Sequence, residues 1–233
     1  MAQANRGLGG EYNEPSVLRI FTLASLVALF GGCAPPGVAP LPPDSRAARE
    51  ALQSVWAEKT PNIDGNVGDE EWRRALRIEV PARSGNARCF FYFMNDEENL
   101  YVGVAAVNDT TNANRGRAAG GFDNMAIWFG AEIGYWLYGN GELRSDRIVG
   151  GSRTTFPFGS AAEARVLGPP KAEHMMYELL IPLKEVGIQP GETVAIGFHY
   201  WDNYNRGPSF WWPSGVSVWS ASSYGALTLS RRP

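Results

Sequence analysis

The chain has few residues of the kinds that hold metals or form disulfides. Its 233 residues include only two cysteines and two histidines. His174 and His199 stand far apart and no CxxC occurs, so motifs for zinc and for covalent haem attachment are missing. Cys33 and Cys89 have such different neighbours that their even number does not predict a disulfide. Cys89 lies in the strand-like run ARCFFYF and is expected to be a small buried hydrophobe.

Positive charge is also scarce. The 21 Lys and Arg residues are outnumbered by 24 Asp and Glu, which gives a formal net charge of -3. A protein that binds nucleic acid needs a basic face to neutralise phosphates. We therefore expect no nucleic-acid partner.

The common catalytic motifs are missing too. The sequence holds no GxSxG, no HExxH and no P-loop. A glycosidase needs two carboxylates that flank the scissile bond, and nothing in the sequence selects two of the acidic residues for that role. Serines gather at Ser214, Ser217, Ser220, Ser222 and Ser223, but no histidine follows them. We expect that the protein is not an enzyme.

No apolar run is long enough to span a bilayer, which takes about 20 residues. The thirteen uncharged residues 20–32 follow Arg19 and fit the core of a signal peptide. Gly31-Gly32 before Cys33 resembles a bacterial lipobox, in which the cysteine is lipidated and becomes the new N-terminus. A plain secretory signal cut near Ala34 is the alternative. We expect a protein exported to the cell envelope, with a lipid anchor on the outer membrane or the cell surface.

Three segments follow from these patterns. Residues 1–32 are expected to be the signal peptide, with its true start at Val17, because the first sixteen residues do not resemble a charged n-region. Residues 33–56 are expected to form the anchor, an extended Pro-rich tether and a short helix over 46–56. Residues 57–233 are expected to form one domain.

This domain is rich in residues of strands and turns. The chain has 27 Gly and 16 Pro, and aromatic residues make up 12%. Apolar residues recur with period two in about nine runs, separated by polar clusters. The runs are 77–80, 87–94, 99–107, 122–131, 134–139, 146–151, 175–183, 192–201 and 224–230. Strand and helix do not alternate, so the pattern predicts an all-β fold, an antiparallel β-sandwich.

Short motifs punctuate these runs. Asp64-Gly65 and Asn140-Gly141 are strong turn dipeptides, because glycine readily adopts the positive φ that such turns need. Residues 183–187, LKEVG, predict a single helical turn after Pro182, and Pro190-Gly191 precedes the next strand.

Five motifs occur in the order known from one family. They are NIDGNVGDEEWRRA (62–75), DEENLYVGVAAVNDT (96–110), DNMAIWFG (123–130), YELLIPLKEVGIQPGETVAIGFHYWDN (177–203) and YGALTL (224–229). Together they resemble the family 9 carbohydrate-binding modules. The resemblance implies a jelly-roll sandwich without catalytic activity, which binds sugars between paired aromatic rings and often carries structural calcium. Met125-Ala126 departs from the small and acidic residues usual at that place.

The resemblance and the signal peptide together predict a carbohydrate-binding lipoprotein. It would hold oligo- or polysaccharide at the bacterial envelope for carbohydrate catabolism, beside an envelope glycosidase or a transport system.

The stretch 198–219, FHYWDNYNRGPSFWWPSGVSVW, combines indole rings with turn residues. A sugar presents CH-rich faces, which Trp and Tyr cover, and hydroxyls, which short polar side chains satisfy. Alternation places Trp136 and Tyr138 on one face of their strand, opposite Tyr135 and Leu137. The expected sugar-binding residues are Trp136, Tyr138, Trp201, Asp202, Asn203, Trp212 and Trp219. Trp136 and Trp219 are the expected principal stacking rings, then Trp212, whereas Trp72 and Trp128 are assigned to the core or to a seam between sheets.

Two acidic turns offer oxygen ligands for calcium. One holds Asp64, Asp69, Glu70 and Glu71, and the other holds Asp96, Glu97 and Glu98. Calcium takes 6–8 oxygen ligands, but no EF-hand loop is present, and solvated acidic turns are the alternative.

Two other functions remain open. Relatives of this sandwich bind b-type haem in electron-transfer subunits, for which Met94, Met175, Met176, His174 and His199 are available in principle. The tryptophan-rich stretch could instead be an interface for another envelope protein, with Trp201 and Arg206 as anchors.

Overall fold

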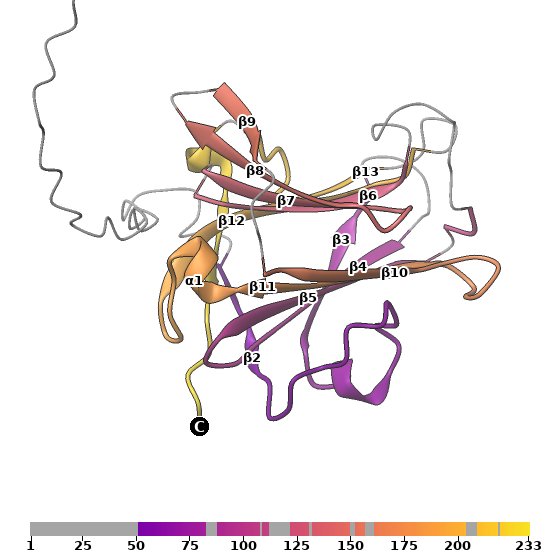
Figure 1. The fold of residues 1–233 in the computed structure, drawn as a ribbon, viewed down its shortest axis with the longest axis horizontal. Helices are drawn as coiled ribbons and strands as arrows, with labels where there is room; N and C mark the ends of the chain where they lie inside the picture. Colours follow the sequence, from indigo (N-terminus) through magenta and orange to yellow (C-terminus); the bar gives the residue numbers. More distant parts are fainter. Residues whose placement is uncertain are drawn as a thin grey trace, which may run out of the picture. The chain divides into compact units, whose positions relative to one another are not determined.

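The fold is known from a computed structural model (Figure 1). It describes residues 51–82, 88–107, 109–111, 122–130, 132–149, 152–156, 161–203, 209–218 and 220–233. The expected signal peptide, Cys33, the Pro-rich tether, Arg206 and Trp219 lie outside these residues. Across the described ranges, no helix is long and apolar enough to cross a membrane.

The strands form two sheets that lie one over the other (Figure 1). The larger sheet has eight strands in the order β1-β14-β12-β6-β7-β8-β9, with β13 beside β12. Its strands are β1 Ala51–Gln53, β6 Asn124–Phe129, β7 Ile133–Tyr138, β8 Leu143–Val149, β9 Ser152–Phe156, β12 Thr193–Trp201, β13 Ser209–Trp212 and β14 Gly225–Thr228.

The smaller sheet has six strands in the order β10-β11-β5-β4-β2, with β3 beside β4. Its strands are β2 Val55–Trp56, β3 Leu76–Pro81, β4 Arg88–Asn95, β5 Asn99–Val107, β10 Glu163–Leu167 and β11 Met175–Pro182. The described helices are short: η2 Glu70–Trp72, α1 Leu183–Val186 and η5 Ala221–Ser223.

The expected all-β sandwich is confirmed. Each of the nine predicted runs contains a strand, and every described pairing is antiparallel except β1 with β14 and β2 with β4. The helical turn predicted at LKEVG is α1, which ends at Gly187 with φ 69°. The turn glycines Gly65 and Gly141 also have positive φ, at 97° and 85°.

The segment 51–56 corrects the expected helix. Ala51–Gln53 pairs with β14 in the larger sheet, and Val55–Trp56 pairs with β4 in the smaller one. Buried Ser54 stands at the crossing between the sheets, where its hydroxyl donates to Asn95. Pairing with both sheets overrides the helical propensity of the segment. The sandwich therefore includes residues before the expected boundary at 57.

Three more strands were not predicted. β9 and β10 lie between the predicted runs 146–151 and 175–183, and β13 lies in the tryptophan-rich stretch after the predicted run 192–201. All three are short and lack a clear run of alternating apolar and polar residues, so this pattern does not predict them.

The core between the sheets uses one face of each strand. Phe198 of β12 packs there against Phe91 and Phe93 of β4, with ring centroids 4.5 and 5.2 Å apart. Cys89 is fully buried in this core, as expected. Alternation then directs every second residue of the same strands outward.

Both outer faces are covered as well. On the smaller sheet, Trp72 joins Val67, Met94 and Tyr101 in a second buried cluster. Trp72 belongs to the segment between β2 and β3, which Figure 1 draws below β4 and β5. A third cluster covers the larger sheet. This burial on both sides explains why β7 is buried at all six positions.

A buried carboxylate holds the segment between β2 and β3 on the smaller sheet. Glu178 of β11 accepts hydrogen bonds from the backbone N–H groups of Asp64 (2.7 Å) and Gly65 (2.6 Å), and from the Trp72 indole (2.6 Å). Gly65 is required here, since a Cβ on it would lie 2.9 Å from the backbone of Val166 and Leu167. Burial raises the pKa of Glu178 to about 7, although the three donors act in the opposite direction.

The replacement Glu178→Gln should destabilise the fold. A buried amide N–H would face a donor, which costs about 1–3 kcal/mol. The pKa of Glu178 is higher in the folded state than in the unfolded chain, where it is near 4.5, so the folded state binds this proton more tightly. The stability gained from this tighter proton binding is fully present below pH 4.5 and is lost as the pH rises through 7. The difference in unfolding free energy between the wild type and Glu178→Gln should therefore be larger at pH 5 than at pH 8.

Urea unfolding of both proteins at these two pH values measures this difference in unfolding free energy. Glu163→Gln, on the exposed side of β10, is the matched control and should show little change. A difference in unfolding free energy that is the same at both pH values would contradict the raised pKa of Glu178.

Candidate functional site

The outer face of the larger sheet carries aromatic and polar side chains in rows that run across the strands. In one row Trp201 of β12 pairs with Asn124 of β6, which pairs with Tyr138 of β7. In the next row Trp211 of β13 pairs with His199 of β12. That row continues through Ala126, Trp136 and Arg144. Neighbouring strands lie about 4.8 Å apart, so Trp201 and Tyr138 stand roughly 10 Å apart across Asn124.

The rings of the second row form a packed cluster with Trp128. Trp128 lies edge-on to Trp136 with centroids 5.6 Å apart, and parallel to Trp211 at 6.1 Å. His199 lies 4.9 Å from Trp128 and 4.4 Å from Trp211. Gly134 makes this packing possible, because a Cβ on it would come within 2.5 Å of both Trp128 and Trp136.

The polar atoms in this cluster are sparsely paired. His199 Nε2 and Asn124 Oδ1 are 2.9 Å apart and share a hydrogen bond. Burial lowers the pKa of His199 to about 3, so the imidazole is neutral near pH 7. His199 Nδ1 and Trp128 Nε1 are buried without a hydrogen-bond partner. Buried polar atoms without partners are rare and gather at functional sites.

The first row ends at an exposed ring beside short polar side chains. Trp201 is 39% exposed, and it is the single exposed large hydrophobic side chain among the described residues. Its indole N–H donates to Asn203 Oδ1 at 3.2 Å. The backbone N–H of Asn203 donates to Asp123 at 2.6 Å, which fixes the chain just after β12.

The structure does not bring all seven expected sugar-binding residues together. Trp136 and Tyr138 share one face of β7, as predicted, with Tyr135 and Leu137 on the other. They are only 7% and 8% exposed, which corrects the expectation that Trp136 is an exposed stacking ring. Trp201, Asp202 and Asn203 lie together at the exposed end of β12, and Trp219 lies outside the described residues.

Trp212 was expected to stack on a sugar, but the structure places it on the core side of the sheet. It projects from β13 toward the core and stacks on Phe198, with centroids 4.9 Å apart and an angle of 13°. It therefore lies on the opposite face of the sheet from Trp201. Trp72 and Trp128 are buried as expected, at 1% exposure each, but they lie in the clusters on the outer faces of the two sheets and not between the sheets.

Sequence reasoning missed Trp211, His199 and Asn124 as members of this face. The available signal was alternation within 209–212, which sends Trp211 outward when Phe210 and Trp212 face the core. Alternation in β12 likewise places His199 with Trp201, because Phe198 and Tyr200 belong to the core.

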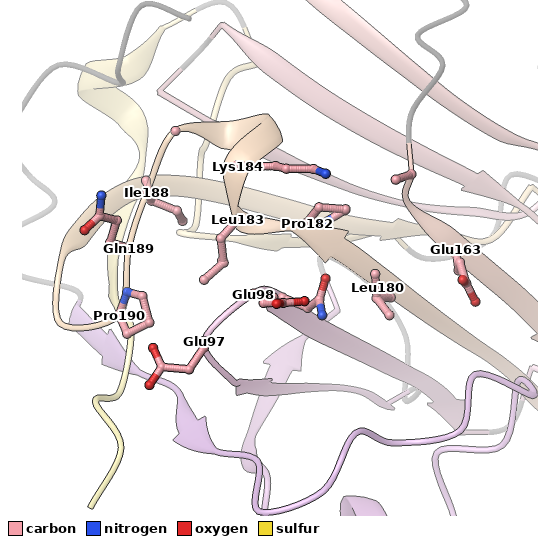
Figure 2. A pocket seen from close by; sticks show the side chains of 13 residues that line it. Glu97, Glu98, Glu163, Leu180, Pro182, Leu183, Lys184, Ile188, Gln189 and Pro190 are labelled. Carbon is pink, nitrogen blue, oxygen red and sulfur yellow. The ribbon is translucent and has the colours of Figure 1, made fainter. Parts of the chain in front are cut away.

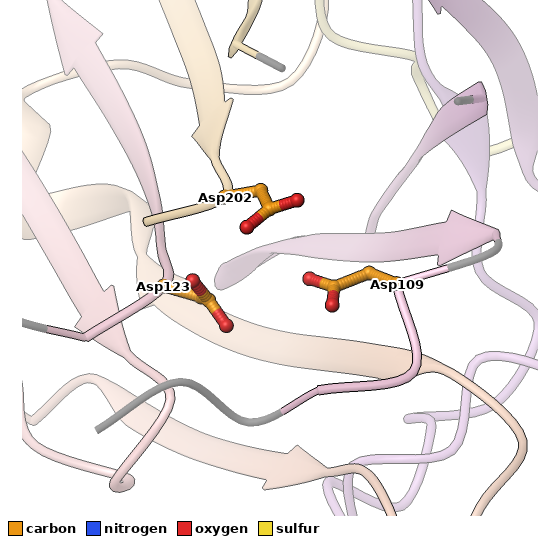
Figure 3. Close-up of side chains that lie close together, drawn as sticks. All are labelled: Asp109, Asp123 and Asp202. Atoms are coloured by element: carbon orange, nitrogen blue, oxygen red, sulfur yellow. The ribbon is translucent and has the colours of Figure 1, made fainter. Parts of the chain in front are cut away.

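A group of three carboxylates lies at the same end of the sandwich. Asp109 follows β5, Asp123 precedes β6 and Asp202 follows β12, and Figure 3 shows their carboxylates turned toward one another. One oxygen from each lies within 4.8 Å of the others. This set of hard oxygen donors fits the structural calcium that the resemblance implies.

The two acidic turns use carboxylates to hold their own backbone. Asp96 accepts from the N–H groups of Glu98 and Asn99, both at 2.8 Å, and Asp64 accepts from Asn66 at 2.9 Å. In the part of the chain that the structure describes, the three carboxylates of the preceding paragraph are the group placed for a shared ion.

The large hollow in Figure 2 is a different place. It has a volume of about 700 Å³ and lies where α1 meets the turn before β5. Glu97, Glu98, Glu163 and Lys184 surround an apolar floor that includes Leu180. None of the described residues that line it is aromatic, so they offer no ring on which a sugar could stack.

The residues considered for haem lie apart. Met175 is in the core between the sheets, Met94 and Met176 are in the cluster on the smaller sheet, and His199 is on the outer face of the larger sheet. His174 and Met176 line one hollow of about 370 Å³, but they stand two residues apart and cannot reach an iron from opposite sides. The described geometry therefore gives the haem hypothesis no axial pair.

Comparison with known proteins supports the fold. No protein-family model matches the chain, and no curated protein matches its sequence. Two solved structures of a family 9 carbohydrate-binding module from Caldicellulosiruptor kristjanssonii are similar to it. The complex with cellotriose has a TM-score of 0.59 and 16% identity, and the alignment covers 79% of this chain and 95% of that one. The complex with glucose has a TM-score of 0.60 and 17% identity, over 79% and 97%.

These identities are low, so the likeness shows the fold alone. The chain is a β-sandwich of the kind found in those modules.

The variant Gly134→Ala should disturb the aromatic cluster. Its new methyl group would overlap two buried indoles that have no free space, which costs about 1–3 kcal/mol. Thermal unfolding should show a lowered Tm, and near-UV circular dichroism should show changed tryptophan bands. Gly68→Ala, at an exposed position, is the control. A variant with unchanged Tm and spectrum would show that the cluster is loosely packed.

Proposed function

We propose that the protein is a non-catalytic carbohydrate-binding protein. Its binding surface is the exposed end of the outer face of the larger sheet, around Trp201. The observation that carries the proposal is the exposed indole of Trp201 beside Asp202 and Asn203, on a sheet face that is otherwise packed with rings. The similar solved modules hold cellotriose and glucose, which supports the class of ligand.

The chemistry of this end suits a sugar. The free face of Trp201 can cover the CH groups of one pyranose ring. Asp202, Asn203 and Asn124 supply donors and acceptors for the hydroxyl groups. Tyr138 stands on the far side of Asn124 and bounds the surface there, with the Arg144 guanidinium 5.3 Å from its ring. Trp219 remains a predicted second ring.

The nearby carboxylates argue against hydrolysis. A retaining glycosidase needs two carboxyl groups about 5–5.5 Å apart on either side of the bond, and an inverting one needs about 6.5–9.5 Å. One oxygen from each of Asp109, Asp123 and Asp202 lies within 4.8 Å of the others, and Asp109 and Asp123 are buried. They are therefore poorly placed to flank a sugar bond.

Loss of the Trp201 ring should abolish most sugar binding. Each ring contact contributes about 1–2 kcal/mol, so Trp201→Ala should weaken binding roughly tenfold or more. Calorimetry and tryptophan fluorescence with glucose, cellotriose and other oligosaccharides measure the affinity, which we expect in the micromolar range or weaker. Trp212→Phe, on the core side of β13, is the matched aromatic control and should bind as the wild type does.

A wild-type protein that binds none of these sugars would overturn the proposal and favour a protein partner. Equal sugar affinity in the wild type and in Trp201→Ala would show that the protein binds sugar at another site.

We further propose that the domain is tethered to the bacterial envelope by lipid on Cys33. There it would hold polysaccharide for an envelope glycosidase or a transport system. The support is the sequence of residues 17–33, an apolar run that ends in Gly-Gly-Cys.

The variant Cys33→Ala should move the protein from the membrane fraction to the soluble fraction. Lipid provides the anchor, and the apolar run alone is too short to span a bilayer. Fractionation with metabolic fatty-acid labelling measures this change. Cys89→Ala is the control. The Cys89 thiol is buried and should carry no lipid, so this variant should keep the label and stay in the membrane fraction. Label retained in Cys33→Ala would contradict the anchor.

A further inference from the structure

The outer face of the smaller sheet has a hollow of about 370 Å³ at Ala105 of β5. Ala105 pairs with Phe90 of β4 on one side and with Met176 of β11 on the other, so a small side chain lies between two large ones. Two positions earlier on β5 the sheet is covered, because a Cβ on Gly103 would lie 2.7 Å from Val67. Val67 belongs to the segment between β2 and β3 and forms the wall of the hollow on that side.

The floor of the hollow is apolar. Phe90, Ala105 and Met176 are buried, and Val107 lines the hollow beside them. Neighbouring strands lie about 4.8 Å apart, so the backbones at Phe90 and Met176 are roughly 10 Å apart, which leaves room for one aromatic ring over Ala105. The thioether of Met176 is a favourable neighbour for such a ring. A small apolar hollow with a few polar groups at its rim is the usual form of a ligand site.

Arg77 of β3 brings a positive charge to one side of the hollow. Its guanidinium lies over the Phe90 ring, with Cζ 3.9 Å from the ring centroid. Arg88 lies over the same ring at 4.9 Å, and it takes both oxygens of Glu79, at 2.8 and 2.9 Å. None of the ion pairs within the described ranges involves Arg77. A guanidinium that rests on a ring still has N–H groups at its edge, which suit a carboxylate in a bidentate pair.

The other polar groups of the rim make the hollow selective. Tyr92 pairs with Arg77 across the strands and lines the same hollow, so its hydroxyl is a second donor on that side. Glu173 and His174 precede β11 and reach the hollow from the opposite side. The carboxylate of Glu173 would repel a second acidic group there. These groups favour a ligand with one carboxylate, placed at the Arg77 end.

We propose that this hollow binds a small aromatic monocarboxylic acid, whose carboxylate pairs with Arg77 and whose ring lies over Ala105. The hollow belongs to the smaller sheet, whereas Trp201 belongs to the larger one, so this is a second site, separate from the proposed sugar surface. The protein would then bind an acid and a sugar on its two outer faces.

Saturation-transfer difference NMR with 3-phenylpropionate tests the site on the purified full-length chain, without any sugar. We expect saturable transfer to the phenyl protons, with a dissociation constant of about 1 mM or below. The probe 3-phenylpropanamide has the same ring without the charge, and propionate has the charge without the ring. Both should bind roughly tenfold more weakly or worse, because each lacks one of the two contacts.

The test variant is Arg77→Met, which keeps an apolar side chain over Phe90 but removes the charge. It should bind 3-phenylpropionate roughly tenfold more weakly and the amide unchanged, so that the preference for the acid disappears. Arg73→Met makes the same change at an exposed position in the segment between β2 and β3 and should behave as the wild type does. Ala105→Leu fills the hollow and should abolish binding of both probes, with circular dichroism showing that the sandwich is folded.

A folded wild type that gives no saturable transfer, or that binds the acid and the amide equally, would overturn the proposal. So would equal affinity for 3-phenylpropionate in the wild type and in Arg77→Met. Trp201→Ala should bind this acid as the wild type does, so the result does not depend on the sugar proposal.

Discussion

Phe198 is the side chain whose packing sets the direction of the functional face. It lies in the core between the two sheets, within 4.5–5.2 Å of Phe91, Phe93 and Trp212 as measured between ring centroids. Because side chains alternate along a strand, a core position at 198 sends His199 and Trp201 to the outer face. A slip of one residue in β12 would bury Trp201 and expose Phe198. The core of the sandwich and the orientation of the candidate site are thus fixed by the same register.

Burial on both faces of the larger sheet places a closely packed aromatic cluster on its outer side. Trp128 and Trp211 pack against His199, and Trp136 packs against Trp128. Gly134 leaves space for the Trp128 and Trp136 rings. Such packing leaves little freedom to the strands below the exposed end. Two buried polar atoms, His199 Nδ1 and Trp128 Nε1, have no hydrogen-bond partner, which costs stability.

The sequence carried enough information to predict the sandwich and nine of its strands, because those strands have long alternating runs. It did not carry enough for residues 51–56, whose pairing with two different sheets depends on contacts distant in the chain. The tryptophan-rich stretch shows the same limit. Its composition predicted aromatic rings at a surface, but the register of β13 decides that Trp211 faces outward and that Trp212 stacks in the core.

The three carboxylates show why a site can escape sequence reasoning. Asp109, Asp123 and Asp202 are far apart in the chain, and each stands at the end of a different strand, so no spacing between them has meaning before the topology is known. The acidic turns that looked richer in oxygen use their carboxylates to close their own backbone. Beside Trp201 it is the fold that brings carboxylates together: Asp109 comes from the smaller sheet and Asp123 and Asp202 from the larger one, and one oxygen of each lies within 4.8 Å of the others.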